Sequence, residues 1–144
     1  MTKIFKSRKD KLFTFIVFGV VLLMLVLSVF DIITQGFKFE SIVLLIINIA
    51  ISALLLWVFF GTHYELSAKE LKYFCGPLKG KILLSDISVI TKNKTMWVGY
   101  KPATARKGLV IKYKKFDEIY ISPDSNETFI KEILKLKANI KING

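Results

Sequence analysis

The stretch 119-IYISPDSNETFIKEIL-134 joins a strand pattern to a helix pattern and decides how the C-terminal part of the chain folds. Before Ser-Pro, apolar and polar residues alternate as in a half-buried strand, and after it the pattern is helical. Ser122 is a suitable N-cap, Pro123 suits the first helical position, where its missing N–H costs nothing, and Asp124 would face the positive helix end. We therefore predict a last strand and then a helix that starts at Ser122 and Pro123.

The helical part of this stretch has one apolar face. Apolar residues recur with a period near 3.6 residues, at Phe129, Ile130, Ile133, Leu134 and Leu136. An amphipathic C-terminal helix is therefore expected. The sequence Asn-Glu-Thr at 126–128 matches a glycosylation acceptor, but it falls in the first turns of this helix, and we interpret it as a chance match.

Upstream of the stretch, short segments alternate in the manner of antiparallel strands. THYELS (62–67) and ELKYFCG (70–76) predict a hairpin around SAKE; KILLSDISVITK (81–92) predicts two short strands or one bent strand; MWVGY (96–100) predicts a further strand; and LVIKYKK (109–115) pairs with EIYIS (118–122). A sheet of about six or seven such strands must close or be covered to hide its edges. We expect an α+β domain, a small bent antiparallel β-barrel capped by the C-terminal helix.

The first part of the chain is much more apolar. Residues 12–30 and 42–60 are two runs of 19 residues without a charged side chain. At about 1.5 Å rise per residue, each run as a helix reaches roughly 28 Å, close to the ~30 Å hydrocarbon thickness of a bilayer. A soluble core helix keeps a polar face, and a cleaved signal peptide has a shorter apolar run and a small-x-small site. These runs therefore predict a retained transmembrane hairpin.

Polar and aromatic residues of the second run suggest how the hairpin is held. Asn48 and Ser52 lie four residues apart and share one helix face, where they could hydrogen-bond to the first helix for about 1–2 kcal/mol. Trp57, Phe59 and Phe60 close the run and predict an aromatic anchor at the membrane interface.

The distribution of charge predicts the topology. Of the 22 basic residues, five lie in the first eleven positions with one acid, one lies in the connector 31–41 with two acids, and 16 follow Phe60 with eight acids. Basic flanks of membrane spans stay in the cytoplasm. We expect a multi-pass protein of the cell membrane with residues 1–61 as a basic tail and two spans, and residues 62–144 as a domain. The N-terminus and this domain would both be cytoplasmic.

Three segments of the C-terminal part carry a resemblance: 61-GTHYEL-66, 76-GPLKGKILLSDI-87 and 107-KGLVIKYKKFDEIYISP-123, followed by Phe129. They are similar to bacterial PH-like domains of the YyaB-like type, over about residues 61–142. The resemblance implies a membrane-tethered, strongly bent β-barrel capped by the C-terminal helix, and it implies no activity, since fold and function are separable. PH domains that bind phosphoinositides carry several basic residues in the loop joining their first two strands. That loop here is SAKE, so phosphoinositide binding is not carried over.

No catalytic or metal-binding constellation is present in the sequence. One histidine, His63, and one cysteine, Cys75, cannot form a zinc site or an intramolecular disulfide. Asp117 and Glu118 are adjacent, so in a strand their carboxylates point to opposite faces. Nucleotide-binding loops and the nucleophile-elbow motif are missing. We therefore expect no enzyme, no metal and no cofactor.

The segment 92-KNKTMWVGYKPATARKG-108 interleaves basic and aromatic side chains. Its candidate contact residues are Lys92, Lys94, Trp97, Tyr100, Lys101, Arg106 and Lys107. Such a segment can dock on anionic lipid headgroups or stack on single-stranded nucleic acid, and the membrane tether argues against nucleic acid. Alternatively, Trp97 packs inside the domain and the lysines are merely solvated.

These observations favour a non-catalytic interaction module for a partner protein or anionic lipid headgroups. The alternative function is a small membrane immunity or transport-accessory factor that acts through its transmembrane hairpin. Asn48 and Ser52 would then be the important residues.

Overall fold

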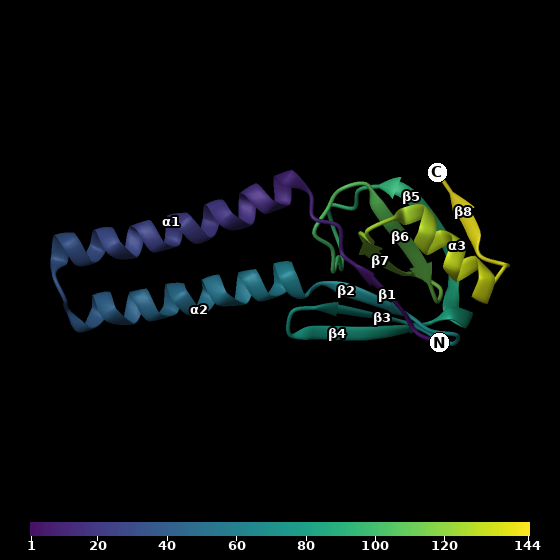
Figure 1. Cartoon of the computed structure of the whole chain (residues 1–144), viewed down its shortest axis with the longest axis horizontal. Coiled ribbons are helices and arrows are strands. Elements are labelled where there is room, and N and C mark those ends of the chain that lie inside the picture. The colour runs from purple at the N-terminus through teal and green to yellow at the C-terminus, as the bar shows by residue number, and fades with distance from the viewer.

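A computed structural model describes residues 1–144 as a long helical hairpin joined end to end to a domain of two sheets and one helix (Figure 1). The two hairpin helices are α1 (Lys11–Gln35) and α2 (Phe39–Gly61). The first strand, β1 (Lys3–Lys6), precedes α1 in the sequence but lies in the domain (Figure 1). The chain therefore leaves the domain through α1 and returns to it through α2.

Both helices are long and apolar enough to cross a membrane, and they contain the predicted spans 12–30 and 42–60. Only 6% and 11% of their most apolar windows are buried within the protein. A core helix of a soluble protein would be mostly buried, so these exposed apolar surfaces associate the chain with a membrane.

One side-chain contact holds the two helices together near mid-length. Asn48 Nδ2 donates to Ser28 Oγ at 2.6 Å and to the carbonyl of Met24 at 3.4 Å. The predicted hydrogen bond from Asn48 to the first helix is therefore confirmed. The same prediction for Ser52 was wrong, because its buried hydroxyl has no hydrogen-bond partner.

The first sheet has the strand order β1-β2-β3-β4 and is antiparallel throughout. It contains β2 (His63–Leu66), β3 (Glu70–Cys75) and β4 (Leu78–Leu83). The predicted hairpin around SAKE is confirmed as β2–β3. The strand β1 was not predicted, and it adds the N-terminal tail to the sheet with Phe5 opposite Tyr64.

The second sheet has the order β7-β6-β5-β8. It contains β5 (Ile87–Lys94), β6 (Gly108–Tyr113), β7 (Asp117–Ile121) and β8 (Lys141–Asn143), and β8 is parallel to β5. A 3₁₀ turn, η1 (Leu84–Asp86), separates β4 from β5. The segment 81–92 thus forms two strands, one of the two predicted outcomes, and the β6–β7 hairpin is confirmed.

The α+β fold class is confirmed, whereas the predicted barrel does not close. The chain turns through η1 instead of pairing β4 with β5, so the two sheets stay separate. A core of 15 apolar residues fills the domain, and it includes Phe129 and Ile133 of α3 (Asn126–Leu136). Burial of the apolar face of α3 therefore completes the core without closure of a barrel.

The helix α3 starts three residues later than predicted. Its N-cap is Ser125, whose Oγ accepts from the amide of Thr128 at 3.3 Å. Ser122 is fully buried, and its hydroxyl is hydrogen-bonded inside the domain, while Pro123 forms a β-bridge with Ser7. Because these two residues are held in the strand-to-helix connection, the predicted helix start at Ser122 and Pro123 was wrong.

The segment MWVGY is not a strand. Lys94 of β5 pairs directly with Gly108 of β6, so residues 95–107 form the connection between them, here called the β5–β6 loop. A strand needs a neighbouring strand for its backbone groups, and residues 96–100 pair with no strand; their one backbone hydrogen bond to the sheet is from the amide of Tyr120 to the carbonyl of Tyr100, at 3.1 Å.

Candidate membrane-facing site

A buried polar network fixes the segment between β1 and α1 to the domain. Ser7 Oγ is within hydrogen-bond distance of Thr104 Oγ1, at 2.9 Å, and of Ser122 Oγ, at 3.0 Å. The hydroxyl of Tyr64 accepts from the amide of Ser122 at 3.0 Å and donates to the carbonyl of Pro102. Burial raises the pKa of Tyr64, so the hydroxyl stays protonated and able to donate at neutral pH.

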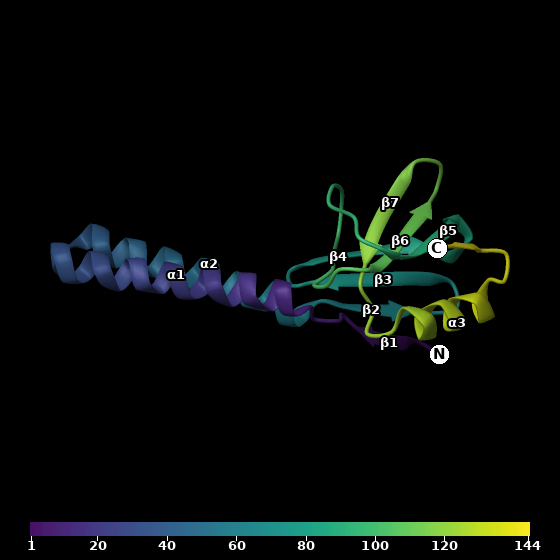
Figure 2. The ribbon, with the colours of Figure 1, turned by 90° about the horizontal axis from the view of Figure 1, so that it is seen from above.

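The β5–β6 loop lies at the end of the domain that faces the helices (Figure 2). Its second half is anchored, since Thr104 and Ala105 are buried and the carbonyl of Thr104 accepts from the amide of Asp10 at 3.2 Å. Its first half is exposed, and Trp97 keeps 69% of its surface accessible. The alternative that Trp97 packs inside the domain is therefore wrong.

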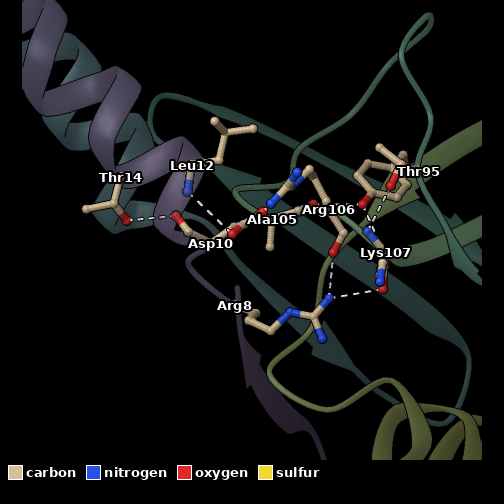
Figure 3. A network of polar contacts seen from close by, with 10 residues as sticks. Arg8, Asp10, Leu12, Thr14, Thr95, Ala105, Arg106 and Lys107 are labelled. Atoms are coloured by element: carbon tan, nitrogen blue, oxygen red, sulfur yellow. Dashed lines mark hydrogen bonds and ion pairs between the residues drawn. The ribbon is translucent and has the colours of Figure 1, made fainter.

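Two charged contacts join the end of this loop to the start of α1 (Figure 3). The guanidinium of Arg8 donates to the carbonyls of Arg106 and Lys107 at 2.7 and 3.0 Å. Arg106 Nε donates to Asp10 Oδ2 at 2.6 Å, and Asp10 Oδ1 accepts from the amide of Leu12 at 3.4 Å as the N-cap of α1. The loop and the first turn of α1 are thus held as one unit.

The Asp10–Arg106 pair stays charged at neutral pH. The hydrogen bond from Arg106 holds the pKa of Asp10 below its usual value, and the carboxylate raises the pKa of Arg106 in return. Asp10 is therefore already neutralised by a neighbouring cation, and its charge does little to offset the other basic groups nearby.

A pocket of about 780 Å³ opens beside these contacts, and we call it the basic pocket. Trp97 forms one of its walls. Five of its lining side chains are basic against a single carboxylate, and they are Arg8, Lys9, Lys11, Arg106 and Lys107, with Asp10 as the acid. Such a pocket attracts anions, and its position at the start of α1 places it beside the apolar surface of the hairpin.

The seven candidate contact residues do not form one surface. Trp97, Arg106 and Lys107 line the basic pocket, while Lys92 and Lys94 lie on β5 outside it. Tyr100 packs edge-on against Tyr73, with ring centroids 5.6 Å apart.

Lys101 serves the loop itself. Its Nζ donates to the carbonyl of Trp97 at 3.1 Å and lies 6.0 Å from the indole centroid. It therefore steadies the exposed Trp97.

Sequence reasoning missed the contribution of the N-terminal tail to this site. The basic tail was interpreted as a topology signal in preference to a segment drawn to anionic lipid, yet Arg8, Lys9 and Lys11 supply three of the five basic groups of the pocket. The alternation of KIFK at 3–6 is too short to predict a strand, and its pairing with β2 spans almost 60 residues. Only the folded arrangement brings the tail to the β5–β6 loop.

Aromatic side chains surround the ends of the helices. Lys9 Nζ lies 4.6 Å from the ring centroid of Phe60 and 5.5 Å from that of Phe59, within the range of a cation–π contact. Trp57 and Phe60 are exposed, whereas Phe59 is buried against α1. This arrangement is typical of an interfacial belt at the headgroup level.

The domain has no group of three or more His, Cys, Asp or Glu side chains that could hold a metal ion. His63 stacks on Phe74 with ring centroids 4.5 Å apart. Cys75 is partly buried, with its Sγ 3.7 Å from the hydroxyl of Thr62. Both residues are accounted for by packing.

A family model described as Bacterial PH domain matches residues 62–137, which run from the residue before β2 to the residue after α3. This match covers more than half of the chain. The chain belongs to the bacterial PH domain family. No curated protein and no solved structure matches it. Bacterial PH domains usually serve as non-catalytic interaction modules, and here the domain follows two helices that can span a membrane.

Proposed function

We propose that this protein is a non-catalytic, membrane-anchored interaction module that presents the β5–β6 loop of its bacterial PH domain to a partner protein or to anionic lipid headgroups. The exposed Trp97 beside basic side chains is the observation that carries the proposal, because Trp is enriched at membrane interfaces and basic groups are attracted to anionic lipid headgroups. Its basic neighbours Arg106 and Lys107 suit an anionic contact.

The short connections between helices and domain keep this loop at the membrane surface. Only Thr62, which is buried, separates α2 from β2, and residues 7–10 join β1 to α1. The turn at Gly76 also meets α2 so closely that a Cβ at this position would approach the backbone of Val58 to 3.0 Å. The domain therefore has little freedom to swing away from the hairpin.

The pairing of β1 with β2 supports a cytoplasmic domain. Because the two strands are hydrogen-bonded, the N-terminus and the domain must lie on the same side of the membrane. The connector between the helices has one basic residue, Lys38, and all others lie on the side of the domain. By the positive-inside rule, that side is the cytoplasm. Reporter fusions at the C-terminus that are active only outside the cell would contradict this orientation.

Site-specific photo-crosslinking in native membranes tests the proposal. The full chain is required, since a fragment of residues 62–144 would lack β1. A benzoylphenylalanine at position 97 is expected to give lipid or protein adducts. The matched control is position 116, an aromatic residue that is 84% exposed at the β6–β7 turn; Figure 2 shows this turn farther from the hairpin than the β5–β6 loop. Equal adduct yields at the two positions would refute the proposal.

The alternative is a membrane immunity or transport-accessory factor that acts through the hairpin. The structure gives it less support, because the amide of Asn48 is used within the hairpin on Ser28. Under the proposed function, Asn48→Leu and Ser52→Ala preserve activity in cells while lesions of the β5–β6 loop abolish it. The opposite result would favour the alternative.

A further inference from the structure

We infer that the start of α1 and the β5–β6 loop together bind one anionic phospholipid. The basic pocket takes the phosphate of the headgroup, and an apolar groove along α1 takes an acyl chain. This inference deepens the proposed function and rests on it, since it names the lipid contact made beside Trp97.

The basic pocket has free cations that converge from two parts of the chain. Arg8 and Arg106 are engaged with carbonyls and with Asp10. Lys11 and Lys107 are exposed and take part in no ion pair, although they line the same pocket. Both ammonium groups line one pocket although they come from different parts of the chain, so both can donate to one phosphate in charge-assisted hydrogen bonds.

The backbone at Lys107, which lines the basic pocket, is held in an unusual conformation. Its φ is 53°, in the left-handed region that costs a residue with a side chain roughly 1–2 kcal/mol. The carbonyl of Lys107 accepts from Arg8 at 3.0 Å and from Asn126 Nδ2 at 2.9 Å, and its amide donates to Thr95 Oγ1 at 2.9 Å. These contacts determine the position of Lys107 before any ligand binds.

The apolar groove continues from the basic pocket along α1. It has a volume of about 550 Å³ and shares Lys9 and Lys11 with the basic pocket. Below these lysines, its lining residues on α1 are Thr14, Phe15, Phe18, Gly19 and Leu22. A cationic mouth above an apolar groove matches the two halves of an anionic phospholipid.

Gly19 keeps the floor of this groove open. A Cβ built at this position meets no atom within 4 Å. Glycine within a helix costs roughly 0.5–1 kcal/mol relative to alanine, and no packing within the protein requires it here. The absence of a side chain therefore leaves space for something outside the chain.

The depth of the groove fits an acyl chain of one leaflet. From Lys11 to Leu22 the helix rises about 16 Å at ~1.5 Å per residue, close to half of the ~30 Å hydrocarbon core. The groove lies within the uncharged run 12–30, where a bilayer offers only acyl chains, and the basic pocket lies where that run ends. Free phosphate, which has no chain, would leave the groove unused.

Native mass spectrometry of the full chain with added lipids tests the inference. The probes are phosphatidylglycerol and phosphatidylcholine with identical acyl chains, and we expect preferential retention of phosphatidylglycerol. The variant K11Q/K107Q should weaken that preference roughly thirty-fold, as expected for the loss of two cations near a membrane surface. Gly19→Leu should lower retention of phosphatidylglycerol several-fold by filling the groove.

Matched controls separate the site from general effects of charge and bulk. K115Q/K131Q removes two exposed lysines that do not line the basic pocket, and Ala50→Leu adds bulk to the exposed surface of α2. Both should bind phosphatidylglycerol as the unmodified chain does. Hydrogen exchange in β6 of each variant should match the unmodified chain and so exclude unfolding as the cause of a loss.

Three outcomes would overturn the inference: equal retention of the two lipids, a loss in the controls as large as in the site variants, or no effect of Gly19→Leu. The last outcome would indicate charge attraction or phosphate binding without a lipid site. Crosslinking at position 97 is an independent readout. Adducts there without a lipid preference would refute this inference alone, whereas equal adducts at positions 97 and 116 would refute the proposed function.

Discussion

Truncation of Phe5 tests whether the N-terminal tail is part of the domain. Phe5 is only 3% exposed, and its ring meets that of Phe129 edge-on, with centroids 5.1 Å apart. Phe→Ala in a core costs about 3–5 kcal/mol. Because β1 is an edge strand that can relax around the cavity, we expect a cost of about 3 kcal/mol. This is a large share of the ~5–15 kcal/mol by which a domain is stable.

Urea unfolding of the full chain in detergent micelles measures this cost, with amide exchange in β6 as the probe of the domain. With a urea dependence of about 1–3 kcal/mol per molar, a loss of about 3 kcal/mol lowers the midpoint by about 1–3 M. Ile4→Ala is the matched control, because Ile4 precedes Phe5 in the same strand but is 63% exposed. Its effect should stay within about 0.5 kcal/mol.

Equal shifts of the urea midpoint for Phe5→Ala and Ile4→Ala would refute the assignment of Phe5 to the core. Strand pairing would then no longer support an N-terminus and a domain on the same side of the membrane. A large shift for Phe5→Ala alone confirms that β1 completes the fold.

Three further predictions follow from individual contacts. Asn48→Leu should weaken the hairpin by about 0.6–1.7 kcal/mol and Ser52→Ala should leave it unchanged, measured as helix–helix dissociation in micelles, because only the first residue is bonded to α1. Ser125→Ala should destabilise α3 by about 1 kcal/mol and speed amide exchange in its first turn, an effect that would be absent if the helix started earlier. The carboxyl of Asp10 should titrate below pH ~3.9 by NMR, and Arg106→Gln should return it toward that value. Since the pKa of this group is lowered in the folded state, the stabilisation by the pair is complete at neutral pH and is lost as the pH falls through the lowered value. If the titration midpoint of the Asp10 carboxyl were unchanged in the Arg106→Gln variant, that result would contradict the Asp10–Arg106 pairing.

Local patterns in the sequence were sufficient for most of the elements. Two uncharged runs of 19 residues specify two helices because a bilayer requires that length and composition. Alternation of apolar residues identified β2, β3, β6 and β7 because one face of each is turned to a core. These signals lie within single elements and need no knowledge of neighbours.

The errors arose where a residue has two suitable uses. Ser122 and Ser125 are both good caps by residue type, and only the network with Ser7 and Thr104 shows that Ser122 is already engaged. Likewise, MWVGY has strand composition but pairs with no strand. Lys94 pairs directly with Gly108, so residues 95–107 are left as a loop. The competing interaction in each case is distant in sequence.

The candidate site was also predicted only in part from the sequence. The composition of the segment 92–108 predicted a contact surface, and Trp97 of this segment is exposed in the structure. The basic pocket could not be predicted, because three of its five cations come from the N-terminal tail. The position of these three cations in the pocket depends on the pairing of β1 with β2 and on the hydrogen bonds from Arg8 to the β5–β6 loop.

The amino-acid sequence alone determined that this protein is an apolar hairpin followed by a small α+β domain, because length, periodicity and charge act along the chain. The tertiary structure decided that the tail is a strand, that the sheets stay separate and that a basic pocket opens above an apolar groove on α1. These features depend on which segments meet in space. Pairing and packing energies between distant residues select that arrangement, and no local pattern encodes it.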